Sequence, residues 1–511
     1  MSVPKITLKS ALLKAMQKSL LDLQGKKIKL FRGEKMKGNS VTRNAVYNIA
    51  YTVIGLAFSL ISSIYISRVF APAGVGHIAY MNNIVSYFVS FAPLGIPTYG
   101  IRAVADSNNK QTLNNTYSEL FILNFISTVF FSVIYIVLVF VNPNFYKEMT
   151  LYLIAGIPLF LNIFNNDWFY RGVEKYKYIT IRSTFIKILS LVAIFVFVRD
   201  KSDILKYLLI SGFATAGNYC WNYIHARKYV KLNFRFNRSH LTKHLKPIIA
   251  LFISLVAGSI YSKIDITMLG VMCTDESVGY YSNAIKIVHM VTPAIAAITA
   301  VMLPSLSTFF SENKKREFDD LVTTTFYVVL LLAVPAFLGV LFIGEDIVVL
   351  LYGEAFLKTS QVLKVLSLLF IVVGVGDLLA YQLVVAVKKE IILPKIRIIA
   401  TLLNAVLNFF LIMQLQETGA ALATVITEVF TLIVVAYIMR EYISIKFNFK
   451  LLLSIIISSV IMCCALFILG QFIESLIFRV VLSLVVAVVT YIVPVIFINK
   501  EVINEIIKKS H

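Results

Sequence analysis

Charged residues and cysteines are scarce in this 511-residue chain. Asp, Glu, Lys and Arg together make up 15% of it, while 59% of the residues are hydrophobic. This composition excludes an ordinary soluble globular protein, in which about 25% of residues are charged. There are only four cysteines, three of them in long apolar stretches and two adjacent: Cys220, Cys273, Cys463 and Cys464. Their spacing excludes a disulfide framework and a cysteine-ligated metal site.

Acidic residues are in particularly short supply. The chain has 27 Asp and Glu against 48 Lys and Arg, a net charge of +21. An excess of this size can indicate nucleic-acid binding, but here it is divided among short segments between apolar runs, and no soluble basic domain remains. We therefore expect no nucleic-acid partner, and we expect the basic segments to be attracted to anionic membrane lipids.

Long apolar runs are what the chain has in abundance. A bilayer core about 30 Å thick needs about 20 helical residues, and about fourteen stretches supply that length. The chain is therefore predicted to be an all-α integral membrane protein. The predicted spans are residues 41–66, 77–101, 116–141, 147–170, 179–198, 204–226, 247–269, 279–304, 321–343, 361–385, 395–415, 416–439, 450–471 and 474–498.

Loops that are rich in lysine and arginine alternate along the chain with loops that have few or none. Residues 1–43 and the loop at 227–246 are the richest, whereas the loops at 270–278 and 415–416 carry no basic residue. Cytoplasmic flanks retain positive charge, so this alternation predicts that both termini are cytoplasmic.

The first 38 residues precede the first span and are strongly basic. Within them, Leu8, Leu12, Met16 and Leu20 fall on one face of a helix, with lysines on the others. The pattern favours an amphipathic helix on the inner leaflet, although a poorly ordered basic tail remains the alternative. No cleavage pattern of a signal peptide follows it.

A weak internal repeat relates the two halves of the chain. In one constant register, Gly55 matches Gly258, and Val75–Gly76 match Val278–Gly279. The register aligns the first two spans with the seventh and eighth, so the unit has six spans and both copies share one orientation, a transporter architecture. The predicted organisation is two parallel six-helix lobes plus two C-terminal helices: an extension at 1–38, an N-lobe at 39–226, a basic linker at 227–246, a C-lobe at 247–440 and a final pair with a tail at 441–511.

Three lysines fall inside the predicted spans. A lysine at the bilayer centre costs about 2.5 to 3.5 kcal/mol, so it normally faces a bundle interior, a water-filled cavity or a partner. Lys263 lies near the outer end of its span and Lys286 near the outer start of the next, so both can share one layer. With His289 and Asp265 nearby, this layer is a predicted receptor for an anionic group such as phosphate. Lys187, nearer mid-span, is predicted to face a cavity.

Alternatives remain open for these charged residues. Lys263, Asp265 and Lys286 could instead form a buried ion pair that only locks two helices together. The in-membrane or boundary acids are candidates for binding a coupling cation or proton: Asp167, Asp377 and Glu428. Asp167 and Asp377 also fit solvated helix ends, whereas Glu428, at mid-span, is the better candidate for ion coupling.

Further polar residues line the same spans. Arg43 is predicted at the cytoplasmic entrance, and Asn83 and Asn283 occupy similar places in the two repeats. Such amides contact substrate or simply hydrogen-bond neighbouring helices. Pro93 and Pro293 interrupt helical hydrogen bonding in matching spans, which predicts bent helices at these points.

Five segments resemble a known family when taken in order along the chain: 68–76 (RVFAPAGVG), 94–102 (LGIPTYGIR), 168–176 (WFYRGVEKY), 264–270 (IDITMLG) and 278–284 (VGYYSNA). They are similar to the Wzx-type polysaccharide repeat-unit flippases of the multidrug/oligosaccharidyl-lipid/polysaccharide exporter superfamily. The likeness covers nearly everything from residue 39 to 498. The segment at 384–390 (VVAVKKE) departs from the pattern, because relatives usually have a proline and a glycine before the basic pair.

The resemblance implies a MATE-like fold and a function. Such proteins move an undecaprenyl-pyrophosphate-linked oligosaccharide across the bacterial cytoplasmic membrane by alternating access, for capsule, exopolysaccharide or O-antigen synthesis. The implied partners are the lipid-linked oligosaccharide, membrane lipids, and a polysaccharide polymerase and glycosyltransferases. No cofactor is expected other than a coupling ion, H⁺ or Na⁺.

Two other functions are weighed against this one. A cation-coupled multidrug exporter of the same superfamily would favour an acidic cavity, whereas basic residues outnumber acids in the seventh and eighth spans. A membrane scaffold or polymerase of a polysaccharide synthesis complex belongs to a different class. Enzymatic chemistry on a sugar needs acid, base or metal-binding groups in a sizeable water-facing loop, and the sequence offers none, so we expect no enzymatic activity.

Overall fold

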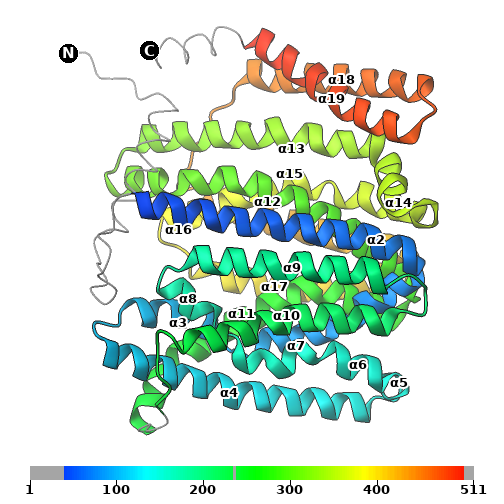
Figure 1. The fold of residues 1–511 in the computed structure, drawn as a ribbon. Coiled ribbons are helices and arrows are strands. Elements are labelled where there is room, and N and C mark those ends of the chain that lie inside the picture. The colour runs from blue at the N-terminus through cyan, green and yellow to red at the C-terminus, as the bar shows by residue number, and fades with distance from the viewer. Residues whose placement is uncertain (1–38, 234–237, 500–511) are drawn as a thin grey trace. The chain divides into compact units, whose positions relative to one another are not determined.

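A computed structural model of the chain describes residues 39–233 and 238–499, and the side chains of 39–45, 49 and 238–241 are excluded from that description. Every regular element in these ranges is a helix, and no strand occurs in them (Figure 1). The prediction of an all-α protein is therefore confirmed. Ten helices of the described chain are long and apolar enough to cross a membrane.

The described residues divide into two compact units. The N-terminal unit comprises residues up to Gly270 together with Thr274–Gly279, and the C-terminal unit comprises Val271–Cys273 and the chain from Tyr280 onward. Helix α11 (Arg238–Met272) thus lies almost wholly in the N-terminal unit. The predicted span 247–269 was expected in the second lobe, whereas the structure places it in the N-terminal unit, together with the residues of the first six predicted spans.

The first two predicted spans form one element, α2 (Asn39–Phe91), which is interrupted by non-helical backbone at Ala71. Pro72 follows directly, and its ring and missing N–H prevent an unbroken helix there. The second span ends early, at Phe91, and resumes as α3 (Ile96–Ala105) after a turn that contains Pro93. The break predicted from Pro93 is present.

The fourth predicted span, 147–170, is wrong as a continuous helix. It consists of short pieces: α5 (Pro143–Lys147), α6 (Met149–Ala155), α7 (Ile157–Phe160), η3 (Leu161–Phe164) and α8 (Asp167–Gly172). The physical reason is local polarity. The Asn124 amide donates to the carbonyls of Asn162 and Ile163, at 2.9 and 3.2 Å, and so satisfies groups that helix hydrogen bonds would otherwise occupy.

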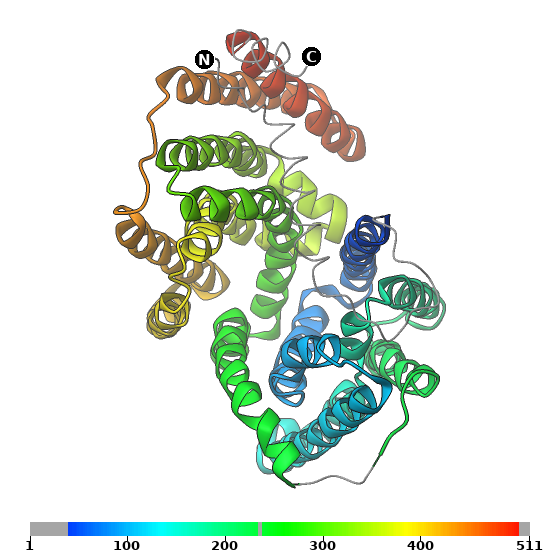
Figure 2. The same cartoon turned by 90° about the vertical axis from the view of Figure 1, so that its left-hand side faces the viewer.

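The remaining helices of the N-terminal unit are α4 (Lys110–Val141), α9 (Tyr176–Phe197) and α10 (Ile204–Ala226). Helix α9 lies beside both α2 and α10 (Figures 1 and 2). Two of the family-like segments form the contact between α3 and α8. Gly100 faces the Trp168 ring so closely that a Cβ there would lie 2.7 Å from it. Trp168, Phe169 and Tyr170 are buried in the core of this unit.

The C-terminal unit contains α12 (Asp275–Ser311) from Tyr280 onward, α13 (Lys315–Tyr352), η4 (Glu354–Phe356) and the long α17 (Ile392–Met439). Non-helical backbone at Gln416 divides α17 into the eleventh and twelfth predicted spans. The tenth predicted span, 361–385, lies within one stretch, Glu354–Ala386, that is long and apolar enough to cross a membrane. Its helical type changes along the way, from α14 (Leu357–Leu366) and α15 (Leu369–Gly376) to the π-helix η5 (Asp377–Leu383) and α16 (Val384–Ala386). Helices α18 (Phe449–Phe472) and α19 (Leu476–Ile498) pack on each other and on α13 (Figure 2).

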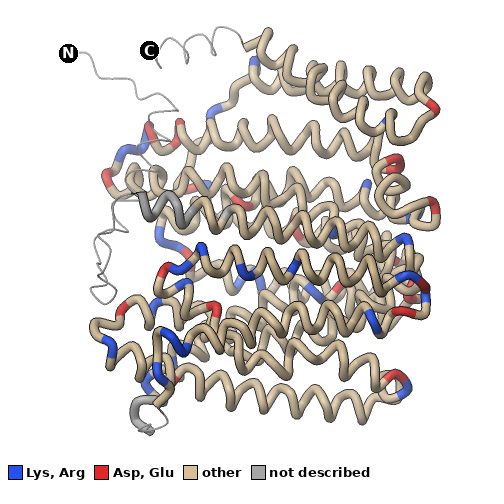
Figure 3. Tube along the Cα trace, viewed as in Figure 1, with Lys and Arg blue, Asp and Glu red and all other residues tan. Residues whose placement is uncertain are grey.

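Charged residues lie mainly near helix ends, as expected for membrane-spanning segments. Figure 3 shows this in both units, and it also shows basic positions along the length of α9. The chain is a multi-pass membrane protein by the length and apolar character of its helices. The basic positions within α9 therefore require an explanation.

Candidate functional site

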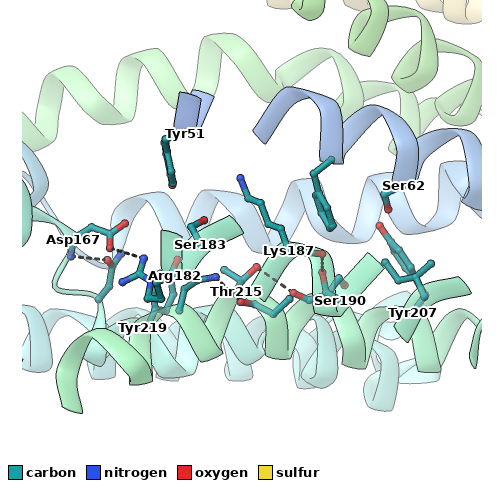
Figure 4. A pocket seen from close by; sticks show the side chains of 16 residues that line it. Tyr51, Ser62, Asp167, Arg182, Ser183, Lys187, Ser190, Tyr207, Thr215 and Tyr219 are labelled. Atoms are coloured by element: carbon teal, nitrogen blue, oxygen red, sulfur yellow. Dashed lines mark hydrogen bonds and ion pairs between the residues drawn. The ribbon is translucent and has the colours of Figure 1, made fainter. Parts of the chain in front are cut away.

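A cavity of about 340 Å³ lies inside the N-terminal unit. Its wall is formed by α2, the junction of η3 and α8, α9 and α10 (Figure 4). All of these elements belong to one compact unit. The cavity is therefore a property of this unit alone.

Helix α9 supplies the polar stripe of the wall. Arg182, Ser183, Lys187 and Ser190 all line the cavity. At 100° per residue these positions fall within one half of the helix circumference, so a single face of α9 carries them. The opposite face carries apolar residues that are exposed in the isolated chain and suited to lipid, including Phe185, Ile188 and Leu189.

Lys187 reaches from α9 toward α2. Its ammonium nitrogen lies 5.1 Å from the centre of the Tyr51 ring, a cation–π contact (Figure 4). Within the described residues, neither a hydrogen bond nor an ion pair of this nitrogen is found. A positive charge inside a membrane helix bundle without an anionic partner attracts anions.

Arg182 is fixed by a network of its own. Its Nη2 donates to Asp167 Oδ1 at 3.3 Å, its Nε donates to Asn218 Oδ1 at 3.1 Å, and the guanidinium stacks over Tyr178. The Arg182 side chain is 4% exposed. Asn222 also donates to Asp167. The carboxylate that the sequence suggested for ion coupling is thus paired with an arginine.

The charges in this wall do not cancel. Asp167 neutralises Arg182, so the ammonium of Lys187 remains as the excess positive charge of the cavity. Ser190 and Thr215 contribute hydroxyl groups, which donate to the carbonyls of Lys187 and Ser211 at 3.0 and 3.1 Å. Because hydroxyl protons rotate, these groups can turn toward a bound oxyanion. The arrangement suits a phosphate-like group.

Sequence reasoning found Lys187 and Asp167 but missed Arg182 as a residue of this wall. Arg182 lies one turn inside the predicted span 179–198, and only lysines were considered as basic residues within the spans. The signal that identifies it is its position on the same helical face as Lys187 and Ser190.

Lys263 is placed differently from the expectation. Its Nζ donates to the Ser86 carbonyl at 2.7 Å and to Ser90 Oγ at 2.8 Å, and it lies 5.2 Å from the centre of the Tyr87 ring. All three partners are on α2. These contacts fasten α11 to α2, which is the helix-locking role, although with hydroxyl and carbonyl partners.

Asn83 and Asp265 lie in the same region. The Asn83 amide donates to the Lys263 carbonyl at 3.2 Å and to Thr267 Oγ1 at 2.7 Å, so it also joins α2 to α11. Asp265 is buried. The predicted layer around Lys263 is thus a polar seam between two helices of the N-terminal unit.

The other predicted residues lie in the C-terminal unit. Lys286 donates to Asn283 Oδ1 at 3.2 Å, within α12, and the His289 side chain is exposed. Asp377 begins the π-helix and accepts hydrogen bonds from Thr299 and, at 3.2 Å, from Gln382.

Glu428, the mid-span acid, has a basic neighbour. Its carboxylate lies 3.7 Å from Arg397 Nη1, and Arg397 also donates to the Tyr381 hydroxyl at 2.8 Å. The ion pair joins the two halves of α17. Arg43 lies in the part of α2 whose side chains are outside the described residues. The whole predicted extension at 1–38 is also outside the described residues.

Comparison with known proteins gives a consistent result. Residues 41–310 match the sequence profile of the family described as "Polysaccharide biosynthesis protein". The probable low-salt glycan biosynthesis flippase Agl15 of Haloferax volcanii is 26% identical over 42% of this chain and 45% of its own, so that match spans less than half of the relative. The capsular polysaccharide biosynthesis protein CapF of Staphylococcus aureus is 25% identical over 78% of this chain and 100% of its own.

Solved structures share the fold. The lipid II flippase MurJ in an inward closed conformation superposes with a TM-score of 0.74 at 14% identity, covering 90% of this chain and 100% of that one. An inward-facing MATE family transporter gives 0.59 at 14% identity, covering 76% and 94%. These likenesses confirm the predicted MATE-like fold.

Proposed function

Because the chain belongs to the family of polysaccharide biosynthesis proteins, we propose that it is a flippase that moves a lipid-linked oligosaccharide from one leaflet of a membrane to the other. The oligosaccharide is an undecaprenyl-pyrophosphate-linked repeat unit for a cell-surface polysaccharide. The membrane is the bacterial cytoplasmic membrane, and both termini lie in the cytoplasm. The names of the relatives, a flippase and a capsular polysaccharide biosynthesis protein, support this proposal.

The observation that carries it is the uncompensated ammonium of Lys187 in the cavity of the N-terminal unit. A pyrophosphate linker is the charged part of a lipid-linked oligosaccharide, and it must leave water to cross the bilayer. An ammonium and adjacent hydroxyl groups replace part of its hydration. The cavity, about 340 Å³, has room for a phosphate group but not for the whole lipid-linked sugar.

Movement between leaflets then proceeds by alternating access, without chemistry on the sugar. The chain needs no cofactor for this, and a coupling ion, H⁺ or Na⁺, supplies the driving force. Polymerase and glycosyltransferases are the partners that consume and supply the substrate. Lys286 and Asn283 remain proposed contacts for the substrate elsewhere on its path.

Cation-coupled drug export is the nearest alternative, and the N-terminal cavity argues against it. A cavity that binds a cationic drug should be acidic, whereas the one carboxylate among the described residues of this wall, Asp167, is already paired with Arg182 and accepts a hydrogen bond from Asn222. A cationic drug would also be repelled by Lys187. A scaffold for a synthesis complex would need no charged cavity at all.

The test uses the purified full-length chain in lipid vesicles. Undecaprenyl-pyrophosphate-linked oligosaccharide carries a fluorophore that an impermeant reductant bleaches. Without a flippase, only the outer half of the fluorescence is lost. We expect nearly complete bleaching with the chain present.

Phosphatidylcholine with the same fluorophore is the control, and it should stay half protected. Half protection of the lipid-linked sugar in the presence of folded chain would overturn the proposal. Uptake of a cationic dye by the same vesicles, with no movement of the sugar, would favour the exporter instead.

A further inference from the structure

Two glycines that the internal repeat makes equivalent pack against each other in the N-terminal unit. A Cβ on Gly76 would overlap the Asp275 carbonyl oxygen, and a Cβ on Gly279 would overlap the Pro72 carbonyl oxygen. In the register of the repeat, Pro72 corresponds to Asp275. The contact is therefore reciprocal, because each glycine packs against a backbone carbonyl of the segment that contains the other glycine. We call these four residues the glycine seam.

The glycine seam joins the kink of α2 to the first turn of α12. This turn, Thr274–Gly279, belongs to the N-terminal unit, and the chain enters the C-terminal unit at the next residue, Tyr280. The seam is thus the last attachment of the chain to the N-terminal unit before it crosses to the other one. The N-terminal unit therefore holds the first turn of α12 and not the rest of that helix.

A histidine next to the glycine seam contacts two carboxylates. His77 follows Gly76, and its Nδ1 lies 3.2 Å from Asp275 Oδ2, while its Nε2 lies 2.9 Å from Glu148 Oε2 at the junction of α5 and α6. The His77 side chain is 20% exposed, and those of Glu148 and Asp275 are 40% and 45% exposed. Protons from the aqueous phase can therefore reach this cluster.

The number of protons on the imidazole decides how many of these contacts form. The imidazolium donates through both nitrogens and makes both ion pairs. The neutral ring has one N–H, so its second nitrogen directs a lone pair at a carboxylate. Deprotonation thus removes one contact and both charge attractions.

We propose that His77, Glu148 and Asp275 form a proton-controlled latch, which holds the first turn of α12 on the kink of α2 when the imidazole is charged and releases it when the imidazole is neutral. The glycine seam makes the close approach possible, and the latch decides whether it persists. By the predicted topology, the latch lies at the outer ends of the helices. Acid on that side fastens it.

The other titratable groups near the latch do not compete for this role. Besides the two carboxylates, the titratable groups of the described residues that face it are the phenols of Tyr80 on α2 and Tyr152 on α6. Phenols ordinarily titrate near pH 10 and carboxylates near pH 4, so the imidazole alone changes charge between these limits.

Release of the turn can be measured by labelling a buried position on it. The full chain is first freed of its own thiols by replacing Cys220, Cys273, Cys463 and Cys464 with serine. Ser277→Cys then places one thiol on the turn, where Ser277 is 3% exposed. Thr274→Cys, at an exposed position of the same segment, corrects for the effect of pH on the reagent. An impermeant maleimide is applied at about pH 5.5 and at about pH 8, on either side of the ordinary histidine pKa.

With His77 present, the ratio of Ser277→Cys to Thr274→Cys labelling should rise about fivefold or more from the lower to the higher pH. His77→Gln, which is neutral at both pH values, should give a high labelling ratio at both. His77→Lys, which stays charged, should give a low labelling ratio at both. Gly279→Ala, with the histidine intact, should give a high ratio at both. An equal ratio at the two pH values with His77 present would overturn the latch. This readout needs no substrate, so it stands or fails independently of the proposed flipping.

Discussion

The ammonium nitrogen of Lys187 occupies space that the absence of a side chain on Gly55 leaves open. A Cβ on Gly55 would lie 3.0 Å from this nitrogen. Helix α2 therefore approaches α9 at a glycine, directly opposite the excess charge of the cavity. The internal repeat places Gly258 at the equivalent point of the second copy, where a Cβ would meet nothing within 4 Å.

Gly55→Ala should impair flipping while the chain still folds. The added methyl meets the far end of a flexible lysine, which can move, so helix packing survives but the ammonium is displaced from its place in the cavity. We expect a loss of about tenfold in the vesicle assay, equivalent to about 1.4 kcal/mol. Gly258→Ala is the matched control and should leave the rate unchanged. Equal effects of the two substitutions would refute the role of Lys187 geometry.

Lys187→Ala should reduce flipping of the lipid-linked oligosaccharide by about tenfold or more, because the excess charge that meets the pyrophosphate is lost. Lys187→Arg should retain part of the rate, since the charge stays. Lys177, exposed near the start of the same helix, provides the control Lys177→Ala. The measurement is the initial rate of flipping in the vesicle assay, compared at equal amounts of inserted protein. An unchanged rate for Lys187→Ala would show that the cavity takes no part in the mechanism.

Asp167→Asn should destabilise the N-terminal unit more than most single changes. It leaves the guanidinium of Arg182, 4% exposed, without its carboxylate partner. Because the Asp167 side chain is 28% exposed, the loss should fall below the value of about 3 to 5 kcal/mol for a fully buried pair. Replacing Arg182 with leucine as well should recover part of the loss. Thermal unfolding in detergent measures both. If the double variant is no more stable than Asp167→Asn, the two residues do not act as a pair.

Asp203, in the turn before α10, gives a prediction about acid. Its carboxylate accepts hydrogen bonds from Lys206 and from the backbone N–H groups of Arg199 and Asp200, which lower the pKa of Asp203 to about 2. A lowered pKa stabilises the fold above the unfolded value of about 4, and that contribution disappears as pH falls through the folded value.

The melting temperature of Asp203→Asn should therefore lie below that of the unaltered chain by a constant amount from pH 7 to about pH 4, and the gap should narrow toward pH 2. Unfolding curves over this range provide the check. A difference in melting temperature that grows on acidification would contradict the lowered pKa of Asp203.

Sequence periodicity was sufficient for most of the fold because a bilayer imposes one dominant rule. A backbone in hydrocarbon has to satisfy its own hydrogen bonds, so each run of about 20 apolar residues becomes a helix. The rule failed at 147–170, where Asn124 takes carbonyls that a helix would use. A side chain from another helix cannot be read from the apolar run itself.

The site was only partly predictable for a related reason. Hydropathy identifies a lysine in a span as costly, and this pointed to both Lys187 and Lys263. It does not say what surrounds the ammonium. Lys263 has two oxygen acceptors on α2, whereas Lys187 faces a cavity.

The sequence by itself determined that this chain crosses a membrane many times, that its helices repeat, and that a few positive charges lie within them. These follow from composition and order, which act locally along the chain. Only the tertiary structure decided that Asp167 forms an ion pair with Arg182, that Lys187 keeps an uncompensated charge, and that Gly76 packs against the Asp275 carbonyl. Such pairings depend on which helices touch and at what height, and packing sets that between residues far apart in sequence.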